Sequence, residues 1–193
     1  MATLSSPNRI VWEYFSTLRR LVEEAQNAPS TDICRQNTVL SVFMAVTVTE
    51  VFINMWFRVR VENRHSEAEK KAFLKELSFP QPASLDRKLK QWPERYLGGP
   101  IDFSSGPGAE FMRLKDLRNS MVHFTSKYET FQYDNVVIHR LADTSSYDGL
   151  VSDDALWALQ TAEDMVAEIF KKSGADCDRI PHKLHAWTGK FPV

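Results

Sequence analysis

The sequence predicts an all-α fold, an up-and-down bundle of about five or six helices with one long central helix. Apolar residues recur at helical spacing along most of the chain. Serine, threonine and aspartate stand before these stretches as capping residues, and glycine or proline follows them. With 193 residues the chain can bury a full core, so we expect one domain over 1–193, with its core at about 35–175 and a tail at 176–193.

The composition is that of an ordinary soluble chain, with 43% hydrophobic and 25% charged residues. The formal net charge is −1, so there is no global basic field and any RNA site must be a local patch. Cys34 and Cys177 are far apart and lack a metal-ligand spacing, which favours reduced thiols in a cytoplasmic protein. The N-terminus lacks the pattern of a secretory signal.

The first two helices follow from caps and apolar spacing. Ser6 before Pro7 starts a helix over 7–27. Residues 30–32 can cap a second helix that runs to about Asn63. Its segment 39–57 is apolar almost all round and long enough to span a bilayer, but it contains Glu50 and Asn54. We therefore expect a buried central helix and no membrane span.

The polar residues of this central helix share one edge. Thr47, Glu50, Asn54 and Arg58 fall within about 80° of each other at ~100° per residue. This stripe is either the only solvated edge of the helix or the lining of a polar groove. In the second interpretation Glu50 and Asn54, one turn apart, point at the same spot and position a substrate.

Two shorter helices come next. A capping box of Ser66 and Glu69 predicts a helix over Glu67–Leu77, and Ser84 caps another that runs through Lys90 before Pro93 kinks or ends it. The segment 87–95 is basic, with aromatic residues beside the cations, a pattern that suits single-stranded nucleic acid. A charged outer face with the aromatic side chains in the core is the interpretation we favour.

A loop over 100–108 leads into the stretch Glu110 to Lys127, EFMRLKDLRNSMVHFTSK. It contains Arg118, Asn119 and His123 in the order R-N-x-x-x-H. An arginine holds a phosphate with a permanent forked charge, and a histidine moves protons near neutral pH. Asn119, one turn from His123, could orient its ring. The core stripe of this helix is Phe111, Leu114, Leu117 and Met121.

The spacing also sets a geometric requirement. Residues five apart on an ideal helix diverge by about 140°, so Arg118 and His123 of one chain do not converge easily. A local distortion of the helix would help, and so would a second subunit facing the same groove.

These residues resemble the HEPN family of all-helical domains, whose catalytic members carry R-x4-6-H, usually with a polar residue directly after the arginine. Glu50 and Asn54 match a second signature of the family, an acidic or polar residue and an amide or basic residue four apart on an earlier helix. The resemblance covers about residues 35–175 and rests on these five residues. It implies metal-independent RNA cleavage, without a cofactor, at a site formed where two subunits meet.

The remaining chain predicts less. Residues 131–150 look irregular, with a possible short strand at 136–138. Ser152 caps a last helix, which Gly174 terminates, and we expect Trp187 and Phe191 to pin the tail. His182 and His185 alone do not predict a metal site.

The sequence therefore predicts a dimeric RNA endonuclease of the HEPN type, acting as a toxin or phage-defence effector, with an antitoxin protein as a possible partner. In this prediction Arg118, Asn119 and His123 are catalytic and Glu50 and Asn54 position the substrate. HEPN members that are neutralised by adenylylation carry a tyrosine where this chain has Thr125, which puts that mode in doubt. The alternative is a non-catalytic helical module that binds a nucleotide or a protein.

Overall fold

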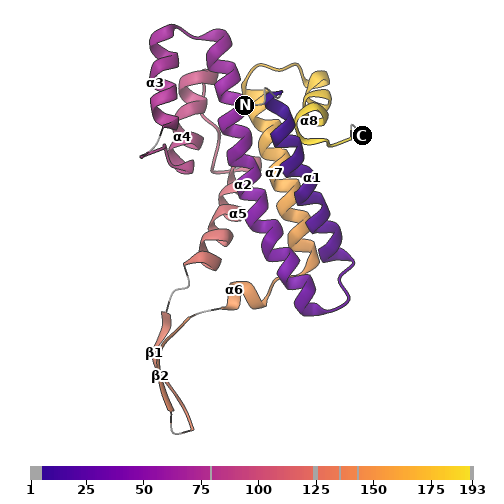
Figure 1. The fold of residues 1–193 in the computed structure, drawn as a ribbon, viewed down its shortest axis with the longest axis vertical. Helices are drawn as coiled ribbons and strands as arrows, with labels where there is room; N and C mark the ends of the chain where they lie inside the picture. The colour runs from indigo at the N-terminus through magenta and orange to yellow at the C-terminus, as the bar shows by residue number, and fades with distance from the viewer. Residues whose placement is uncertain (1–5, 79, 124–125, 135, 143, 192–193) are drawn as a thin grey trace, which may run out of the picture.

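The computed structural model describes residues 6–78, 80–123, 126–134, 136–142 and 144–191. The predicted helical class is confirmed, and Figure 1 shows α1, α2 and α7 side by side as the body of the molecule. This part of the chain holds eight α-helices rather than five or six, two of them short, together with one β-hairpin. The elements are α1 (Pro7–Gln26), α2 (Thr31–Arg64), α3 (Glu67–Leu77), α4 (Leu85–Leu97), α5 (Gly106–Val122), β1 (Ser126–Tyr133), β2 (Val136–Ala142), α6 (Ser145–Asp148), α7 (Ser152–Lys172), the 3₁₀ helix η1 (Cys177–Arg179) and α8 (Ile180–Thr188).

Local capping rules set where α2, α3 and α4 begin. The Ser30 hydroxyl accepts the N–H of Ile33 at 3.3 Å at the start of α2. Ser66 and Glu69 form the predicted capping box of α3. The Ser84 hydroxyl caps α4. Each cap pairs a backbone N–H that the first turn of a helix leaves without an internal partner.

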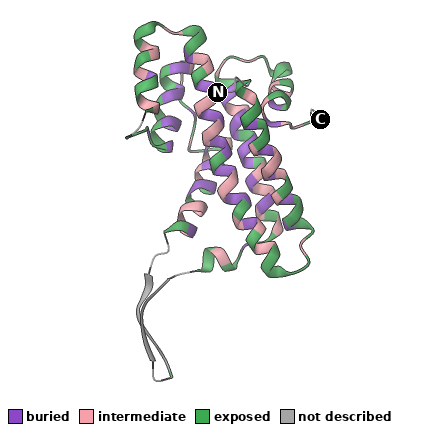
Figure 2. Ribbon diagram, in the orientation of Figure 1, coloured by how far each residue is buried: buried purple, intermediate pink, exposed green. Residues whose placement is uncertain are grey.

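The central helix α2 has 34 residues, and its buried residues extend from Thr38 to Val61 because α1 and α7 pack along it. Figure 2 shows the buried residues concentrated where these three helices face one another. Phe52 joins three helices in this core through edge-to-face contacts with Phe170 of α7 at 5.4 Å and with Trp187 of α8 at 5.5 Å. By length and composition α2 could also cross a membrane, but half of its most apolar stretch is buried within this chain.

The sequence predicted that Pro93 kinks or ends the fourth helix, and the second of these alternatives is wrong. Helix α4 continues to Leu97 and stops at Gly98, whose left-handed φ of 84° is a usual helix terminator. Trp92 is fully buried, with its ring 4.8 Å from Phe73 and 5.6 Å from Phe57. Packing of the residues around Pro93 offsets the backbone hydrogen bond that proline removes.

A β-hairpin replaces most of the region that looked irregular. Strands β1 and β2 pair antiparallel, with Tyr133 opposite Val136 at the turn and Ser126 opposite Ala142 at the base. Asp134 in the turn has a φ of 52°, the left-handed conformation that tight hairpin turns require. Figure 1 shows the hairpin extending away from the helices just after α5 ends.

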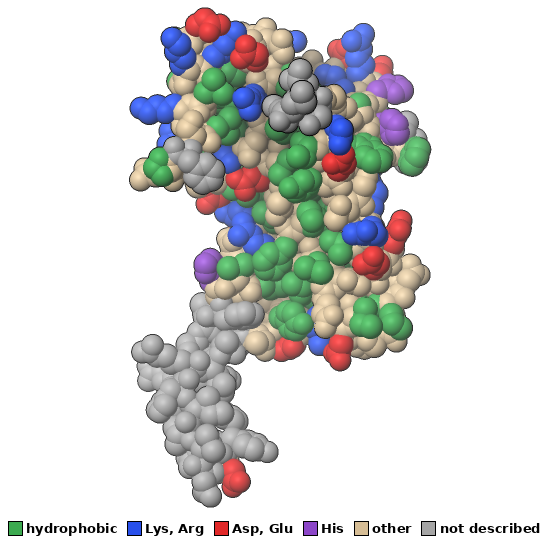
Figure 3. All heavy atoms as spheres, viewed as in Figure 1, with side chains coloured by type: hydrophobic (Ala, Val, Ile, Leu, Met, Phe, Trp, Pro, Cys, Tyr) green, Lys and Arg blue, Asp and Glu red, His purple; other side chains and the backbone are tan. Residues whose placement is uncertain are grey.

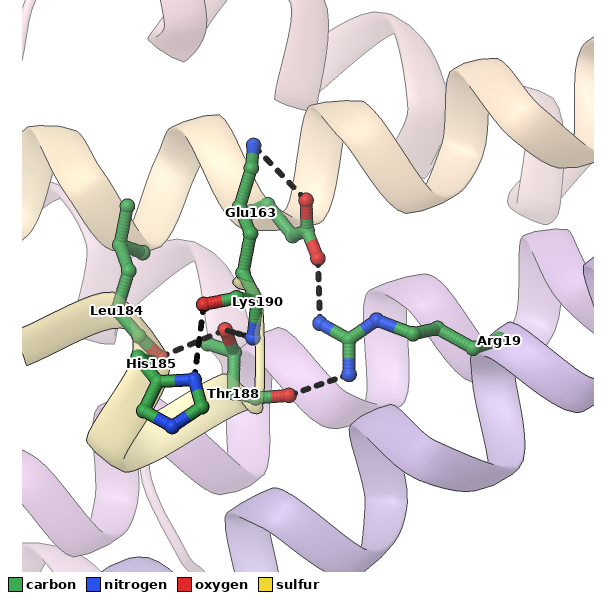
Figure 4. Close-up of polar contacts among 6 residues, drawn as sticks. All are labelled: Arg19, Glu163, Leu184, His185, Thr188 and Lys190. Carbon is green, nitrogen blue, oxygen red and sulfur yellow. Dashed lines mark hydrogen bonds and ion pairs between the residues drawn. The ribbon is translucent and has the colours of Figure 1, made fainter. Parts of the chain in front are cut away.

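The tail folds back as α8 and closes the bundle through a polar network (Figure 4). The Glu163 carboxylate, nearly buried on α7, accepts from Arg19 of α1 at 2.6 Å and from Lys190 at 2.9 Å. Arg19 also donates to the carbonyl of Thr188 at 2.5 Å. Trp187 packs on the core as predicted, whereas Phe191 is 79% exposed and does not pin the tail.

The loop before α5 is held close to the first turn of that helix. The Asp102 carboxylate accepts from the backbone N–H and the hydroxyl of Ser104 and from the hydroxyl of Ser105, and these hydrogen bonds lower its pKa to about 2. A Cβ atom at position 108 would overlap the carbonyl oxygen of Asp102. The approach of the loop to α5 therefore requires glycine at 108.

We predict that Gly108→Ala lowers the free energy of unfolding by about 2 kcal/mol, as overpacking of a close contact does. Helix propensity alone would act in the opposite direction by ~1 kcal/mol, so the sign of the change identifies the cause. Gly99→Ala is the matched control, because a Cβ atom at position 99 would have no neighbour within 4 Å. Urea unfolding of the three proteins measures the effect, and equal stability of Gly108→Ala and wild type would contradict it.

Candidate functional site

Helix α5 holds the R-N-x-x-x-H residues at its C-terminal end. Phe111 and Leu114 are fully buried and Met121 is 6% exposed, so the predicted apolar stripe packs α5 against α2 and α7. Arg118 and Asn119 follow on the last turns and are half-buried. The core contacts of α5 therefore hold the backbone of Arg118 and Asn119 in place.

His123 lies at the C-cap of α5 and is exposed. Its backbone N–H donates to the carbonyl of Asn119 at 2.9 Å, the last hydrogen bond of the helix. Its φ of −111° departs by about 50° from the helical value of about −63°, which rotates the Cα–Cβ bond away from the ideal helical direction. The divergence of about 140° that an ideal helix would give to the Arg118 and His123 side chains therefore does not apply here.

Neither charged group of the motif is engaged elsewhere in the described part of the chain. No hydrogen bond or ion pair of the Arg118 guanidinium or the His123 ring occurs among those residues. The hydrogen bond between Asn119 and His123 is a backbone one, so the predicted bond from the Asn119 side chain to the ring is not formed in this structure. The guanidinium and the imidazole are thus available to an external anion.

Glu50, by contrast, is already paired. Its carboxylate accepts from the Lys88 ammonium of α4 at 2.6 Å, and the Lys88 side chain is 4% exposed. On α5 the buried Lys115 pairs in the same way with Asp86, in the first turn of α4. The first two turns of α4 therefore hold α2 and α5 by two ion pairs, and Glu50 has a structural role in this arrangement.

Asn54, one turn beyond Glu50, has an unsatisfied carbonyl oxygen. Its Oδ1 is buried and has no hydrogen-bond partner among the described residues. Leaving such an atom unpaired costs about 1–3 kcal/mol, and its burial keeps a donor from outside the chain from reaching it without a rearrangement. No hydrogen bond or ion pair in the described part of the chain joins Glu50 or Asn54 to Arg118 or His123.

The basic segment 87–95 does not present aromatic rings to a nucleic acid. Trp92 is fully buried and donates its indole N–H to Glu76 at 2.8 Å, and Tyr96 is 2% exposed. Glu76 also pairs with Arg95 at 3.1 Å and Arg87 at 3.6 Å. The favoured interpretation, a charged outer face over an aromatic core, is confirmed.

Sequence reasoning missed the two buried lysines, although a signal for them exists. Lys115 stands four residues after Phe111, inside the apolar register of α5, and Lys88 stands three residues after Leu85 in α4. A lysine at a core position of a helix predicts a buried ammonium, and a buried ammonium requires a carboxylate nearby. The register of α4 alone therefore predicts an acidic partner for Lys88.

Apolar side chains on α5 and α2 are exposed at the surface. Val122 is 44% exposed at the end of α5 and Leu40 is 51% exposed on α2. Figure 3 shows hydrophobic side chains gathered along the face that α2 presents and toward the end of α5. Exposed apolar side chains that gather in one area mark surfaces where another molecule binds.

Comparisons with protein-family models, with curated proteins and with solved structures found no match for this chain. Among the described residues no group of three or more His, Cys, Asp or Glu side chains is placed to hold a metal ion. A functional assignment therefore depends on the side chains at the end of α5 and on their surroundings.

We predict that Glu50→Ala lowers the free energy of unfolding by about 2–3 kcal/mol, because it leaves a buried ammonium unpaired. Adding Lys88→Met should recover most of this loss by replacing the charge with an apolar side chain of similar length. Thr47→Ala, on the exposed edge of the same helix, serves as the control and should change stability by less than about 0.5 kcal/mol. Urea unfolding measures all four proteins; wild-type stability of Glu50→Ala would show that its carboxylate is free for another role.

Proposed function

We propose that this protein is a metal-independent RNA endonuclease of the HEPN type that acts as a homodimer. The observation that carries the proposal is that an unengaged guanidinium, Arg118, and an exposed imidazole, His123, both lie at the end of one helix. A permanent cation for a phosphate and a group that moves protons near neutral pH are the two requirements for cleaving RNA without a metal. No cofactor is needed for this chemistry.

In the proposed reaction the ribose 2′-oxygen attacks the adjacent phosphorus and the bond from phosphorus to the 5′-oxygen breaks. His123 takes the proton from the 2′-OH or donates one to the leaving 5′-oxygen, and Arg118 binds the phosphate and its developing charge. Asn119 orients the phosphate or the ring, and Asn54 positions the substrate. The products are a 2′,3′-cyclic phosphate and a 5′-OH end, and DNA is spared because it lacks the 2′-OH.

Two features support a second copy as part of the site. The apolar side chain of Val122, next to His123, is exposed, and an isologous interface would cover it on both subunits. Arg118 and His123 lie at the end of α5 and at its cap, so a two-fold axis close to this end would bring the guanidinium of one copy to the imidazole of the other.

The biological setting that we propose is a cytoplasmic toxin or phage-defence effector, held silent by an antitoxin protein. Both cysteines are free thiols, which fits a reducing compartment. The competing function is a non-catalytic helical module that binds a nucleotide or a protein. The Glu50–Lys88 pair favours this alternative in one respect, because it assigns a structural role to a residue that the nuclease hypothesis placed in the site.

We predict that the purified protein cuts labelled RNA but not the matching DNA with EDTA present, and that His123→Ala or Arg118→Ala lowers the rate at least 100-fold, the usual scale of general acid–base catalysis. His182→Ala, a second exposed histidine, and Arg113→Ala, a second arginine of α5, are the controls and should keep the wild-type rate. The product ends should be 2′,3′-cyclic phosphates. Equal cleavage by wild type and His123→Ala would remove the proposal in favour of the binding module.

We further predict partial rescue when the two inactive proteins are mixed after subunit exchange. If each site takes Arg118 from one protomer and His123 from the other, a heterodimer of Arg118→Ala and His123→Ala contains one complete site. Random exchange makes half of the molecules heterodimers, so about a quarter of the wild-type rate should return. A mixture as inactive as its components would contradict a site built from one residue of each protomer.

A further inference from the structure

The outward side of α2 carries side chains at the spacing of a coiled-coil seam. Eight residues follow one another at alternating steps of four and three positions, and each of them is half-buried or exposed. At ~100° per residue they stay within an arc of about 100° along the helix. We call these residues the outer seam: Ile33, Asn37, Leu40, Met44, Thr47, Val51, Asn54 and Arg58.

The outer seam lies away from the core of the bundle. α1 and α7 pack on the buried side of α2, and α5 packs on its flank. Ile33 is 41% exposed and Leu40 is 51% exposed, and Figure 3 shows hydrophobic side chains along the face of α2 that is in view. An apolar strip with helical spacing is the kind of surface that binds one face of an amphipathic helix.

The two ends of the outer seam carry opposite charges. At its start, Ile33 and Asn37 line a shallow cavity of about 500 Å³ together with Glu23 and Glu24 of α1. At its other end is Arg58, which is exposed. Neither Glu23 nor Arg58 forms an ion pair with any residue that the structure describes. The surface is therefore apolar in the middle, acidic at one end and basic at the other.

We propose that the outer seam binds an amphipathic α-helix of a partner protein, which runs antiparallel to α2. About 26 residues of such a helix cover the distance of about 37 Å between Ile33 and Arg58, at ~1.5 Å per residue. Its basic end enters the cavity beside Glu23, and its acidic end meets Arg58. Helices favour acidic residues in their first turn and basic residues in their last turn, and this preference sets the direction of the partner helix.

A second copy of this chain does not suit the same surface. α2 has Asp32 in its first turn and Arg64 in its last, so its charges alone would fit. A two-fold contact between two α2 helices, however, puts the two copies of α5 on opposite flanks of the pair and separates their ends. The choice of a different chain therefore rests on the proposed function, which brings those ends together, whereas the helix-binding surface does not.

The test selects helices from a display library against the full-length protein. Library members have 26 residues, vary among leucine, isoleucine, valine and methionine at heptad positions, and carry lysines at one end and glutamates at the other, in either order. We expect the enriched helices to have glutamates at the N-terminus and lysines at the C-terminus. No enrichment, or enrichment of the opposite order, overturns the proposal.

The apolar middle is tested with Leu40→Glu, which should weaken binding of a selected helix about 10–100-fold, the scale of one buried leucine. Val151→Glu is the matched control, since Val151 is 54% exposed but lies elsewhere. The Thr38 hydroxyl donates to the Val151 carbonyl at 3.3 Å, and Leu40 is about 160° around α2 from Thr38. Fluorescence titration measures the dissociation constants, and equal affinity of Leu40→Glu and wild type overturns the proposal.

The acidic end is tested by exchanging charges. Glu23→Lys together with Glu24→Lys should weaken the selected helix about tenfold, and a helix with glutamates in place of its C-terminal lysines should recover the loss. Asp176→Lys together with Asp178→Lys changes two exposed carboxylates at η1 and should leave the affinity as in wild type. Equal weakening by both double variants overturns the assigned direction of the helix.

The same proteins separate this inference from the nuclease. His123→Ala should bind the selected helix like wild type, and Leu40→Glu should cut RNA at the wild-type rate. If His123→Ala also cuts RNA like wild type, the nuclease falls and the helix-binding surface stands. Self-association of the wild type that is lost in Leu40→Glu would show that a second copy occupies the outer seam, and would overturn the choice of a partner protein.

Discussion

The burial of α2 is the constraint on which the rest of this structure depends. A 34-residue helix that is apolar on most sides must be covered, and α1, α7 and α8 cover it with a continuous core. Its polar edge contacts α4 through Glu50, and α4 in turn contacts α5. The buried pair of Glu50 with Lys88 holds α4, and the pair of Asp86 with Lys115 holds α5 to α4. Charges buried in this way fix one arrangement because any other would leave an ammonium without its carboxylate.

This arrangement explains why the motif is at the edge of the molecule. The apolar stripe of α5 is occupied up to Met121, and the two residues that follow, Val122 and His123, have no core to enter and are exposed. The helix ends there and the chain continues as a strand. A residue at the end of a helix can orient its side chain more freely than one in the middle, and it faces whatever binds at that edge. The end of α5 is thus where rigid positioning and solvent access meet, as a catalytic or binding group requires.

Much of the helical framework could be predicted from local signals, because caps act within four residues and apolar periodicity reports burial directly. Ser30, Ser66 and Ser84 each begin a helix where expected. The failures have a common cause in contacts distant along the chain. Pro93 remains inside α4 because of the packing of Trp92, and the hairpin at 126–142 depends on cross-strand pairing, of which the sequence indicated only a short strand at 136–138. The ion pair of Glu50 with Lys88 likewise joins residues that are 38 positions apart in the chain.

The polar groups that this structure leaves without a partner among the described residues are of two kinds. Arg35 Nε, Asn54 Oδ1 and the Tyr96 hydroxyl are buried, and leaving such an atom unpaired costs about 1–3 kcal/mol. The Arg118 guanidinium and the His123 ring belong to the second kind, because they reach the surface at the end of α5, where water can pair with them. A buried unpaired atom lowers the stability of the fold, whereas a surface guanidinium near an exposed imidazole is held without that cost and can bind an anion. The proposed chemistry therefore depends on the groups of the second kind.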